Sequence, residues 1–267
     1  MAKIGLTNLW YSHLTEGTDG TASYDGAKTL GKAVSASVEV TNNSAKLYAD
    51  DTLVESDTSF SNGTITLGTA DDDASIFADL LGHEVVPAET EGAFPTIIKK
   101  STDVAPYVGV GRIATKMVDG VYQYKVEFLY KVKFSEPSAS ENTKGESVEF
   151  STPEISGIIS ALGDTEGTWS ESKTFSNKSD ALAYLKSLMD VTYTVSYNLN
   201  GGTGTTPASA TVVAGSSVTL DAGTGITAPE GKVFSGWGLT AGATETVSSP
   251  YTPSASVTLY AVYTDEI

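Results

Sequence analysis

The chain has 267 residues, 40% of them apolar, which is enough for a real hydrophobic core in one large domain or two small ones. Its 33 acidic and 16 basic residues give a formal net charge of −17. This charge excludes a protein that grips nucleic acid through clustered lysines and arginines, and it disfavours docking on an anionic membrane surface. Because cysteine is absent, disulfides, thiolate metal ligands and cysteine nucleophiles are also excluded.

The beginning of the sequence, Met1–Trp10, contains neither the apolar stretch nor the small-residue cleavage site of a secretory signal. The apolar runs along the chain are shorter than the ~18–20 residues that a membrane-spanning helix needs. We therefore expect a protein without membrane contact that is made in the cytosol.

The composition changes near residue 190. Only one basic residue, Lys232, lies beyond that point, and the net charge is about −13 before it and about −4 after it. Residues 191–267 are rich in Gly, Thr, Ser, Ala and Val, which is typical of a small all-β module with many turns. We predict two domains, residues 1–190 and 191–267, in a chain that is mainly β with minor α-helix.

The first domain begins with strand-like patterns. Val34, Ala36, Val38 and Val40 alternate with polar residues, which predicts a half-buried strand. The stretch that follows, Ser44–Ser61, is polar and has no strong periodicity. It predicts an extended surface loop.

Two helices are predicted within the β pattern. The first follows three aspartates that can cap free N–H groups, and Gly82 closes it after Ile76, Phe77, Leu80 and Leu81. Ser179 or Asp180 can cap the second helix, which ends at the domain boundary. The apolar residues of this second helix are Leu182, Leu185, Leu188 and Met189.

The clearest hairpin pairs Tyr107–Met117 with Val121–Phe134 across Val118-Asp119-Gly120. Asp-Gly between two strand patterns is a strong signal for a tight turn, because glycine accepts a positive φ. The second arm would extend roughly 40 Å, which suits a barrel or a sheet continued by neighbours. With Leu129 as the exception, its apolar residues are predicted to share one face: Tyr122, Tyr124, Val126, Phe128, Tyr130, Val132 and Phe134.

Motifs for catalysis or cofactor binding are weak. Gly109–Ala114 has the G-x-G-x-x-A spelling of a dinucleotide loop, but a strand follows it instead of a helix, so it predicts a flat strand with close backbone packing. The two histidines, His13 and His83, lack metal-ligand spacing, and His83 is expected at the surface or at a helix end. Asp71–Asp73 lack the other ligands of a calcium loop. We expect no enzyme, no metal and no cofactor.

Seven stretches of the first domain share their sequence and their order with one known family. They are Ala2–Leu6, Leu9–Tyr11, Leu30–Ala33, Asn43–Asp51, Asp103–Gly111, Phe128–Pro137 and Thr143–Ser147. With these stretches, residues 1–190 resemble the phi13-type major tail proteins of long-tailed bacteriophages.

The resemblance implies a tail tube subunit, a β-sandwich or barrel with flanking helices that assembles with copies of itself as stacked hexameric rings. Its partners would be the tape measure protein, the tail terminator and the distal tail proteins. DNA would pass through the tube without specific binding. The protein would be made in the host cytoplasm and reside in the virion, as part of the phage tail.

Four stretches of the second domain carry a different resemblance: Tyr193–Gly202, Val218–Leu220, Lys232–Trp237 and Val257–Tyr263. They resemble the Listeria–Bacteroides repeat of bacterial surface proteins, which implies a small β-grasp-like domain. Asn200-Gly201 predicts a tight turn, Trp237 a core anchor, and the last stretch an alternating strand. This repeat keeps a rival function open, that of a bacterial surface adhesin or binding module.

Under the tail hypothesis, the loop Ser44–Ser61 is a candidate for contact between rings, with a mobile surface loop as the alternative. The candidate contact residues are Lys46, Tyr48, Asp50, Asp51 and Glu55. Deleting Asp50–Ser59 should leave a folded subunit that forms no tubes.

Excess carboxylates facing the channel would repel DNA phosphates, with general solubility as the alternative role. The candidates for this lining are Asp71, Asp72, Asp73, Glu84, Glu89 and Glu91. In the second domain, which would lie on the tube exterior, Tyr251 is the candidate for contact with a host-surface glycan. We expect Trp237 to be buried instead.

Overall fold

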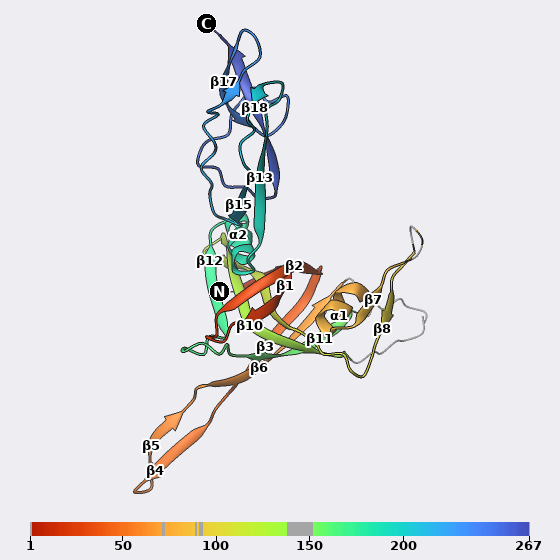
Figure 1. Cartoon of the computed structure of the whole chain (residues 1–267). Coiled ribbons are helices and arrows are strands. Elements are labelled where there is room, and N and C mark those ends of the chain that lie inside the picture. Colours follow the sequence, from red (N-terminus) through yellow and green to blue (C-terminus); the bar gives the residue numbers. More distant parts are fainter. Residues whose placement is uncertain (1, 71–72, 89, 91–92, 138–151, 267) are drawn as a thin grey trace. The chain divides into compact units, whose positions relative to one another are not determined.

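The computed structural model describes residues 2–70, 73–88, 90, 93–137 and 152–266. The chain forms two compact units, Met1–Leu185 and Lys186–Ile267. The division falls within the helix α2 (Lys178–Leu188). Several β-sheets and, in the described part of the chain, two helices make up the fold (Figure 1), so the predicted mainly β fold with minor α-helix is confirmed.

One large sheet dominates the first unit. Its hydrogen-bonded order is β2 (Ala22–Gly31), β1 (Ala2–Glu16), β9 (Tyr107–Val118), β10 (Val121–Ser135), β11 (Glu154–Ser160), β6 (Phe60–Thr69) and β3 (Ala33–Asn42), and β12 (Ser170–Phe175) also pairs with β10. Two small sheets join β4 (Ala45–Ala49) to β5 (Thr52–Asp57) and β7 (Glu84–Val86) to β8 (Thr96–Ile98). Within the described residues, β2 and β3 each pair on one side only, so the large sheet has open edges.

The predicted long hairpin is confirmed. Strands β9 and β10 pair up to Val118 and Val121, and the two residues between them, Asp119 and Gly120, have φ values of 51° and 80°. These left-handed conformations match the twist of the flanking strands. The other edge of β10 pairs first with β12, over Tyr124–Leu129, and then with β11, over Lys131–Ser135. A single long strand therefore holds three neighbours in place.

The prediction that the apolar residues of this arm share one face is wrong beyond Phe128. The pairing with β9 shifts register between Leu129 and Val132, close to the point where the other edge of β10 changes partner. A β-bulge adds a residue to one strand and reverses the faces beyond it. As a result, Leu129 joins Val132 and Phe134 in the main core, while Phe128 packs edge-to-face against Tyr24 and Tyr130.

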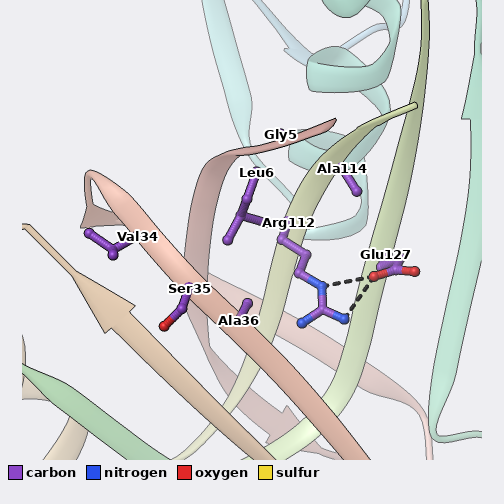
Figure 2. Close-up of a pocket in the computed structure, with 8 residues that line it drawn as sticks. All are labelled: Gly5, Leu6, Val34, Ser35, Ala36, Arg112, Ala114 and Glu127. Atoms are coloured by element: carbon purple, nitrogen blue, oxygen red, sulfur yellow. Dashed lines mark hydrogen bonds and ion pairs between the residues drawn. The ribbon is translucent and has the colours of Figure 1, made fainter. Parts of the chain in front are cut away.

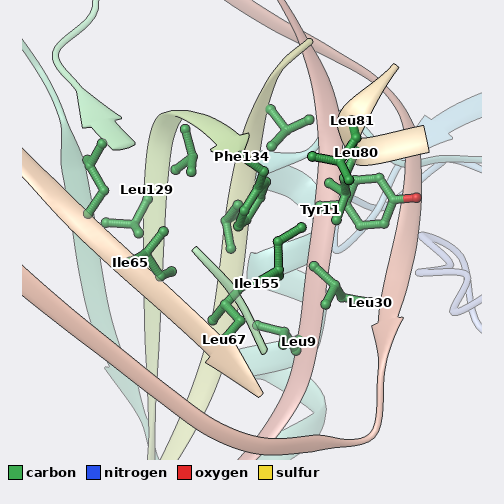
Figure 3. Close-up of a cluster of buried hydrophobic side chains, with 14 residues drawn as sticks. Leu9, Tyr11, Leu30, Ile65, Leu67, Leu80, Leu81, Leu129, Phe134 and Ile155 are labelled. Atoms are coloured by element: carbon green, nitrogen blue, oxygen red, sulfur yellow. The ribbon is translucent and has the colours of Figure 1, made fainter. Parts of the chain in front are cut away.

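The main core of the first unit brings together side chains from seven elements (Figure 3). Its buried residues are Leu9, Tyr11, Leu30, Ile65, Leu67, Leu80, Leu81, Val108, Val110, Leu129, Val132, Phe134, Ile155 and Ile159. The helix α1 (Ala74–Leu81) contributes Leu80 and Leu81. This core fixes the sheet from which the smaller hairpins project.

The helix α1 forms as the sequence predicts. The Asp73 side chain accepts a hydrogen bond from the backbone N–H of Ser75, at 2.9 Å, which satisfies a free donor of the first turn. Gly82 ends the helix with φ 74°, a left-handed conformation that glycine adopts at low cost. A Cβ at this glycine would also lie 2.4 Å from the carbonyl oxygen of Val104.

The second helix is capped by a different residue from those predicted. The Asn177 side-chain oxygen accepts hydrogen bonds from the Asp180 backbone N–H, at 2.8 Å, and from the Ser179 hydroxyl, at 2.9 Å. Helix α2 therefore begins at Lys178, and Ser179 and Asp180 lie in its first turn. Asparagine is as good a cap as serine or aspartate, so sequence preference alone does not choose among three adjacent candidates.

The second unit is a small β domain. Its four-stranded sheet has the order β15 (Ala210–Val213), β13 (Thr192–Asn198), β18 (Val257–Asp265) and β17 (Lys232–Gly238). The central strands β13 and β18 are parallel, and both outer pairs are antiparallel. A second sheet pairs β14 (Thr203–Gly204) with β16 (Ile226–Thr227). The predicted C-terminal β domain is thus confirmed.

The core of this unit is built around Trp237, which is 2% exposed. Its indole N–H donates to the Asp221 carbonyl at 2.7 Å, and its ring contacts those of Tyr197 and Phe234. The predicted turn also forms, because Asn200 and Gly201 have φ values of 48° and 91°. Both the core anchor and the turn are therefore confirmed.

Candidate assembly surface

The most exposed element of the first unit is the hairpin formed by β4 and β5. It continues the ladder between β3 and β6, because Asn42 pairs with Phe60 and the Asn43 N–H donates to the Ser59 carbonyl at 2.8 Å. Figure 1 shows the hairpin running out from the ends of these two strands. Every residue of β4 and β5 is exposed. We call the segment Asn43–Ser59 the arm.

The arm is a hairpin whose register shifts between Leu47 and Tyr48, so the extended loop predicted over Ser44–Ser61 contains two paired strands. Asp50 and Asp51 form its two-residue turn with φ values of 50° and 58°, and the Thr52 hydroxyl donates to the Ala49 carbonyl at 2.8 Å. Aspartate is one of the residues that tolerates this left-handed conformation. The signal in the sequence was an Asp-Asp pair between two short apolar pairs.

All five residues predicted to contact another ring lie on the arm, and all are exposed: Lys46, Tyr48, Asp50, Asp51 and Glu55. Sequence reasoning missed three apolar residues beside them. Leu47, Leu53 and Val54 are 57%, 51% and 61% exposed, and Tyr48 is 61% exposed. An isolated two-stranded hairpin is marginally stable in water, and an exposed apolar cluster is typical of an interaction site.

The carboxylates predicted to line a channel have local partners where the structure describes them. Asp73 caps α1, and Glu84 forms an ion pair with Lys100. The other four candidates, Asp71, Asp72, Glu89 and Glu91, lie outside the described residues. The structure therefore gives Asp73 and Glu84 a local role, and their role in a channel stays a prediction.

His83 lies at the end of α1, as predicted, but its side chain is 9% exposed and is not at the surface. Its backbone N–H donates to the Ala78 carbonyl. The ring nitrogen Nδ1 is 2.7 Å from an Asp103 oxygen, and Nε2 is 3.0 Å from a Glu136 oxygen. The hydrogen bond with Asp103, followed by that with Glu136, raises the pKa of His83 despite its burial.

A histidine that donates from both ring nitrogens must be protonated. In its protonated form, His83 donates to both carboxylates and ties the end of α1 to two segments distant in sequence. The two carboxylates lie on different ring nitrogens and do not converge on one point. In the part of the chain that the structure describes, no group of three or more His, Asp or Glu side chains is arranged to hold a metal ion.

The stretch spelled like a dinucleotide loop lies in strand β9, as predicted. Its close packing is visible at Gly109, where a Cβ would lie 2.5 Å from the Tyr24 ring and 2.7 Å from the Phe128 ring. The absence of a side chain at this position lets the two rings cover the strand. Gly109 therefore serves packing.

In the second unit, Tyr251 is partly buried against the core around Trp237, and its backbone pairs with Val218 in both directions at 2.8 and 2.9 Å. Trp237 is enclosed, as expected, and offers no ring to a glycan. Tyr251 retains a partly exposed ring, and its contact with a glycan stays a prediction.

No helix in the described part of the chain is long and apolar enough to cross a membrane. A search of curated proteins finds no match to this chain. Residues 193–262 match the family model of the Listeria-Bacteroides repeat domain. The second unit of this protein thus contains a Listeria-Bacteroides repeat domain, as the sequence predicted.

Proposed function

We propose that the protein is the major tail tube subunit of a long-tailed bacteriophage, which polymerises as stacked, hexameric rings. The observation that carries the proposal is the arm, a fully exposed hairpin with four solvent-exposed apolar side chains. Burying such side chains against another molecule is favourable by about 25 cal/mol per Å² of apolar surface. A second copy of the chain is the partner that a tube requires.

The open edges of the large sheet support the same proposal. Strands β2 and β3 have unpaired edges within the described residues, and each is ten residues long. Such edges pair readily with another chain. Lateral pairing between neighbours would close a ring, while the arm would reach a copy in the next ring. The two surfaces thus suit the two directions of growth in a tube.

The charge of the chain suits passage of DNA. Residues 1–190 carry a net charge of about −13, and the low number of basic residues leaves few groups that could retain phosphates. A tube that conducts a genome must not bind the DNA that passes through it. The tape measure protein, the tail terminator and the distal tail proteins are proposed as partners on the resemblance to tail proteins.

The second unit would be displayed on the tube exterior. Its Listeria-Bacteroides repeat domain is compatible with surface binding, and many copies on one tube would turn weak contacts into avid ones. A host-surface glycan is the proposed ligand class. No role for this unit in building the tube is proposed.

The same repeat domain favours a second candidate function, a bacterial surface adhesin or binding module. In that case the ligand would bind the second unit, and the arm would have no part in assembly. The two functions predict different effects of removing the arm on assembly.

The arm can be removed cleanly by replacing residues 44–58 with an Asn-Gly turn, so that Asn43 and Ser59 keep their pairing. Deleting Asp50–Ser59 alone would remove β5 and leave β4 without its partner. We expect the full chain to form rings or hollow tubes in negative-stain electron microscopy, and the arm-less chain to stay folded and unassembled. Equal assembly of both chains would contradict the proposal, and so would a full chain that binds a surface ligand but never assembles.

A further inference from the structure

The first unit has an open hollow of about 200 Å³ between β1, β3, β9 and β10. Figure 2 shows its eight lining residues: Gly5, Leu6, Val34, Ser35, Ala36, Arg112, Ala114 and Glu127. Most of them are small or apolar. Arg112 is the one cationic side chain among these lining residues.

Arg112 has an unused hydrogen-bond donor in the hollow. Its Nε and Nη2 atoms are both 2.8 Å from one oxygen of Glu127, on the neighbouring strand. Its Nη1 atom is buried and has no hydrogen-bond partner in the described part of the chain. A buried donor without an acceptor is costly, and it leaves the positive charge of the guanidinium only partly compensated beneath the hollow.

The charges around Arg112 favour a negatively charged occupant. Lys125 contacts the other oxygen of Glu127 at 2.7 Å, so this carboxylate serves two cations. Burial alone would raise the pKa of Glu127, but the hydrogen bond from Lys125 and the charge of Arg112 outweigh it and lower this pKa to about 2. The three side chains together keep one excess positive charge.

The arm offers the matching chemistry at the opposite end of the same strand. The hollow is lined by Val34–Ala36 at the start of β3, and the arm leaves the far end of β3 after Asn42. This separation is about 26 Å at the usual rise of a strand. A surface at one end that fits a surface at the other end generates head-to-tail assembly.

We propose that the tip of the arm of one copy docks in the Arg112 hollow of a second copy, where a carboxylate of Asp50 or Asp51 faces the positive charge of Arg112. The exposed Tyr48 and Leu53 next to the tip would cover Leu6 and Val34, of which Val34 is 50% exposed at the rim. This inference rests on the proposed assembly and names the receptor of the arm within it.

The absence of cysteine makes a direct test possible. We would combine Thr52→Cys, beside the tip, with Val34→Cys, at the rim, and oxidise the protein under assembly conditions. Head-to-tail docking predicts a ladder of covalent dimers, trimers and longer oligomers from the double variant. Each single variant should give on the order of tenfold less covalent product, because only docking raises the local thiol concentration.

The matched control combines Thr52→Cys with Val233→Cys, a valine of the second unit that is 42% exposed, against 50% for Val34. A ladder as strong from this control would overturn the inference, as would a disulfide within one chain or dimers that never extend. Tubes that form in reducing buffer without a ladder on oxidation would overturn the docking site and leave the tube proposal standing. If neither tubes nor a ladder form, both the docking site and the tube proposal are contradicted.

A second test removes the negative charge at the tip of the arm and keeps the shape of its side chains. Asp50→Asn with Asp51→Asn keeps side chains that tolerate the left-handed turn. We expect the concentration needed for assembly to rise about tenfold, because the attraction between the tip and the charge of Arg112 is lost. The control is Asp119→Asn, which alters another left-handed aspartate at an exposed turn. An equal effect of the control, or no effect of the tip variant, would count against docking at Arg112.

Discussion

The two units of the chain treat their apolar side chains in opposite ways. The Lys186–Ile267 unit encloses its tryptophan, with Tyr197, Phe234 and Tyr263 packed around or near it. The Met1–Leu185 unit encloses a larger core but leaves Leu47, Tyr48, Leu53 and Val54 in solvent on the arm. The same residue types thus complete one domain and leave the other with a surface to be covered.

The difference lies in what surrounds one turn of each unit. Both units use two-residue left-handed turns, Asp50-Asp51 in the arm and Asn200-Gly201 in the second unit. At the second turn, the Asn200 side chain donates to the carbonyls of Ala241 and Ala261, both at 2.9 Å. The residues of the arm are exposed along both strands. A turn sets the local path of the chain, and the contacts around it decide whether the neighbouring side chains are covered.

Replacing Trp237 by alanine should have the largest effect on stability. Truncating a buried tryptophan costs about 3–5 kcal/mol, and this side chain also loses its hydrogen bond to the Asp221 carbonyl. We expect the second unit to be unfolded already at 25 °C, so that its unfolding transition is absent. The transition of the first unit should keep its midpoint temperature. Calorimetry would resolve the two. The control is Leu239→Ala, at an exposed position. Loss of both transitions in the Trp237→Ala variant would contradict the contrast between the two units.

Gly109→Ala should have a smaller effect, confined to the first unit. The new Cβ would collide with the rings of Tyr24 and Phe128, both of them buried, and overpacking of this kind costs about 1–3 kcal/mol. Gly5→Ala is the control, because its Cβ would lie 3.8 Å from the nearest atom of Thr115. Urea unfolding measures both. An equal loss in the two variants would argue against close packing at Gly109.

The His83 contacts should make the first unit pH-dependent in a defined direction. The pKa of His83 is raised in the folded state, so its contribution to stability is full below about pH 6.5, its ordinary pKa. The contribution is lost as the pH rises through the folded pKa. The pKa values of Asp103 and Glu136 are lowered, by a hydrogen bond from the Lys100 backbone and by Lys99 respectively, so both stay ionised at pH 5.5.

The measurement compares the unmodified chain with His83→Gln in urea at several pH values. We expect the stability difference between them to shrink from pH 5.5 to pH 8.5. A difference that is constant, or that grows with pH, would show that His83 is not held as a cation between the two carboxylates.

The smallest effect on stability is expected on the arm. Leu53→Ser with Val54→Ser alters exposed side chains, so the free energy of unfolding should change by no more than about 0.5 kcal/mol per substitution. Assembly should nevertheless be lost, because these side chains are proposed to be covered by another copy. Light scattering reports assembly, and urea unfolding reports stability. Unchanged assembly would remove the contrast between the two units.

Local signals in the sequence predicted the long hairpin, the two helices and the core anchor of the second unit. Asp119-Gly120 indicated the position of the long hairpin, and Asp73 and Gly82 indicated the ends of α1. The large side chain of Trp237 indicated the centre of the second core. Each of these depends on the conformational preference of a few adjacent residues or on the size of one side chain. The lack of strong periodicity in the arm was misleading, because a hairpin exposed on both faces needs no alternation of apolar and polar residues.

The Arg112 hollow could not be predicted, because three separate parts of the sequence meet there: β1, β3 and the hairpin of β9 and β10. Its unused donor depends on how these strands pack together. The position of Leu129 has a similar cause. The bulge in β10 occurs where its second neighbour changes from β12 to β11, and the Tyr130 N–H donates to the Trp169 carbonyl at 3.1 Å at that point. Such features follow from tertiary pairing and leave no local pattern.

The most direct test of the account is whether the unmodified chain assembles. Sedimentation velocity over a concentration series, with negative-stain microscopy of the same samples, measures this. We predict that species far larger than the 27.8 kDa chain appear as concentration rises, and that they are rings or hollow tubes. A single 27.8 kDa species at every concentration would contradict the account.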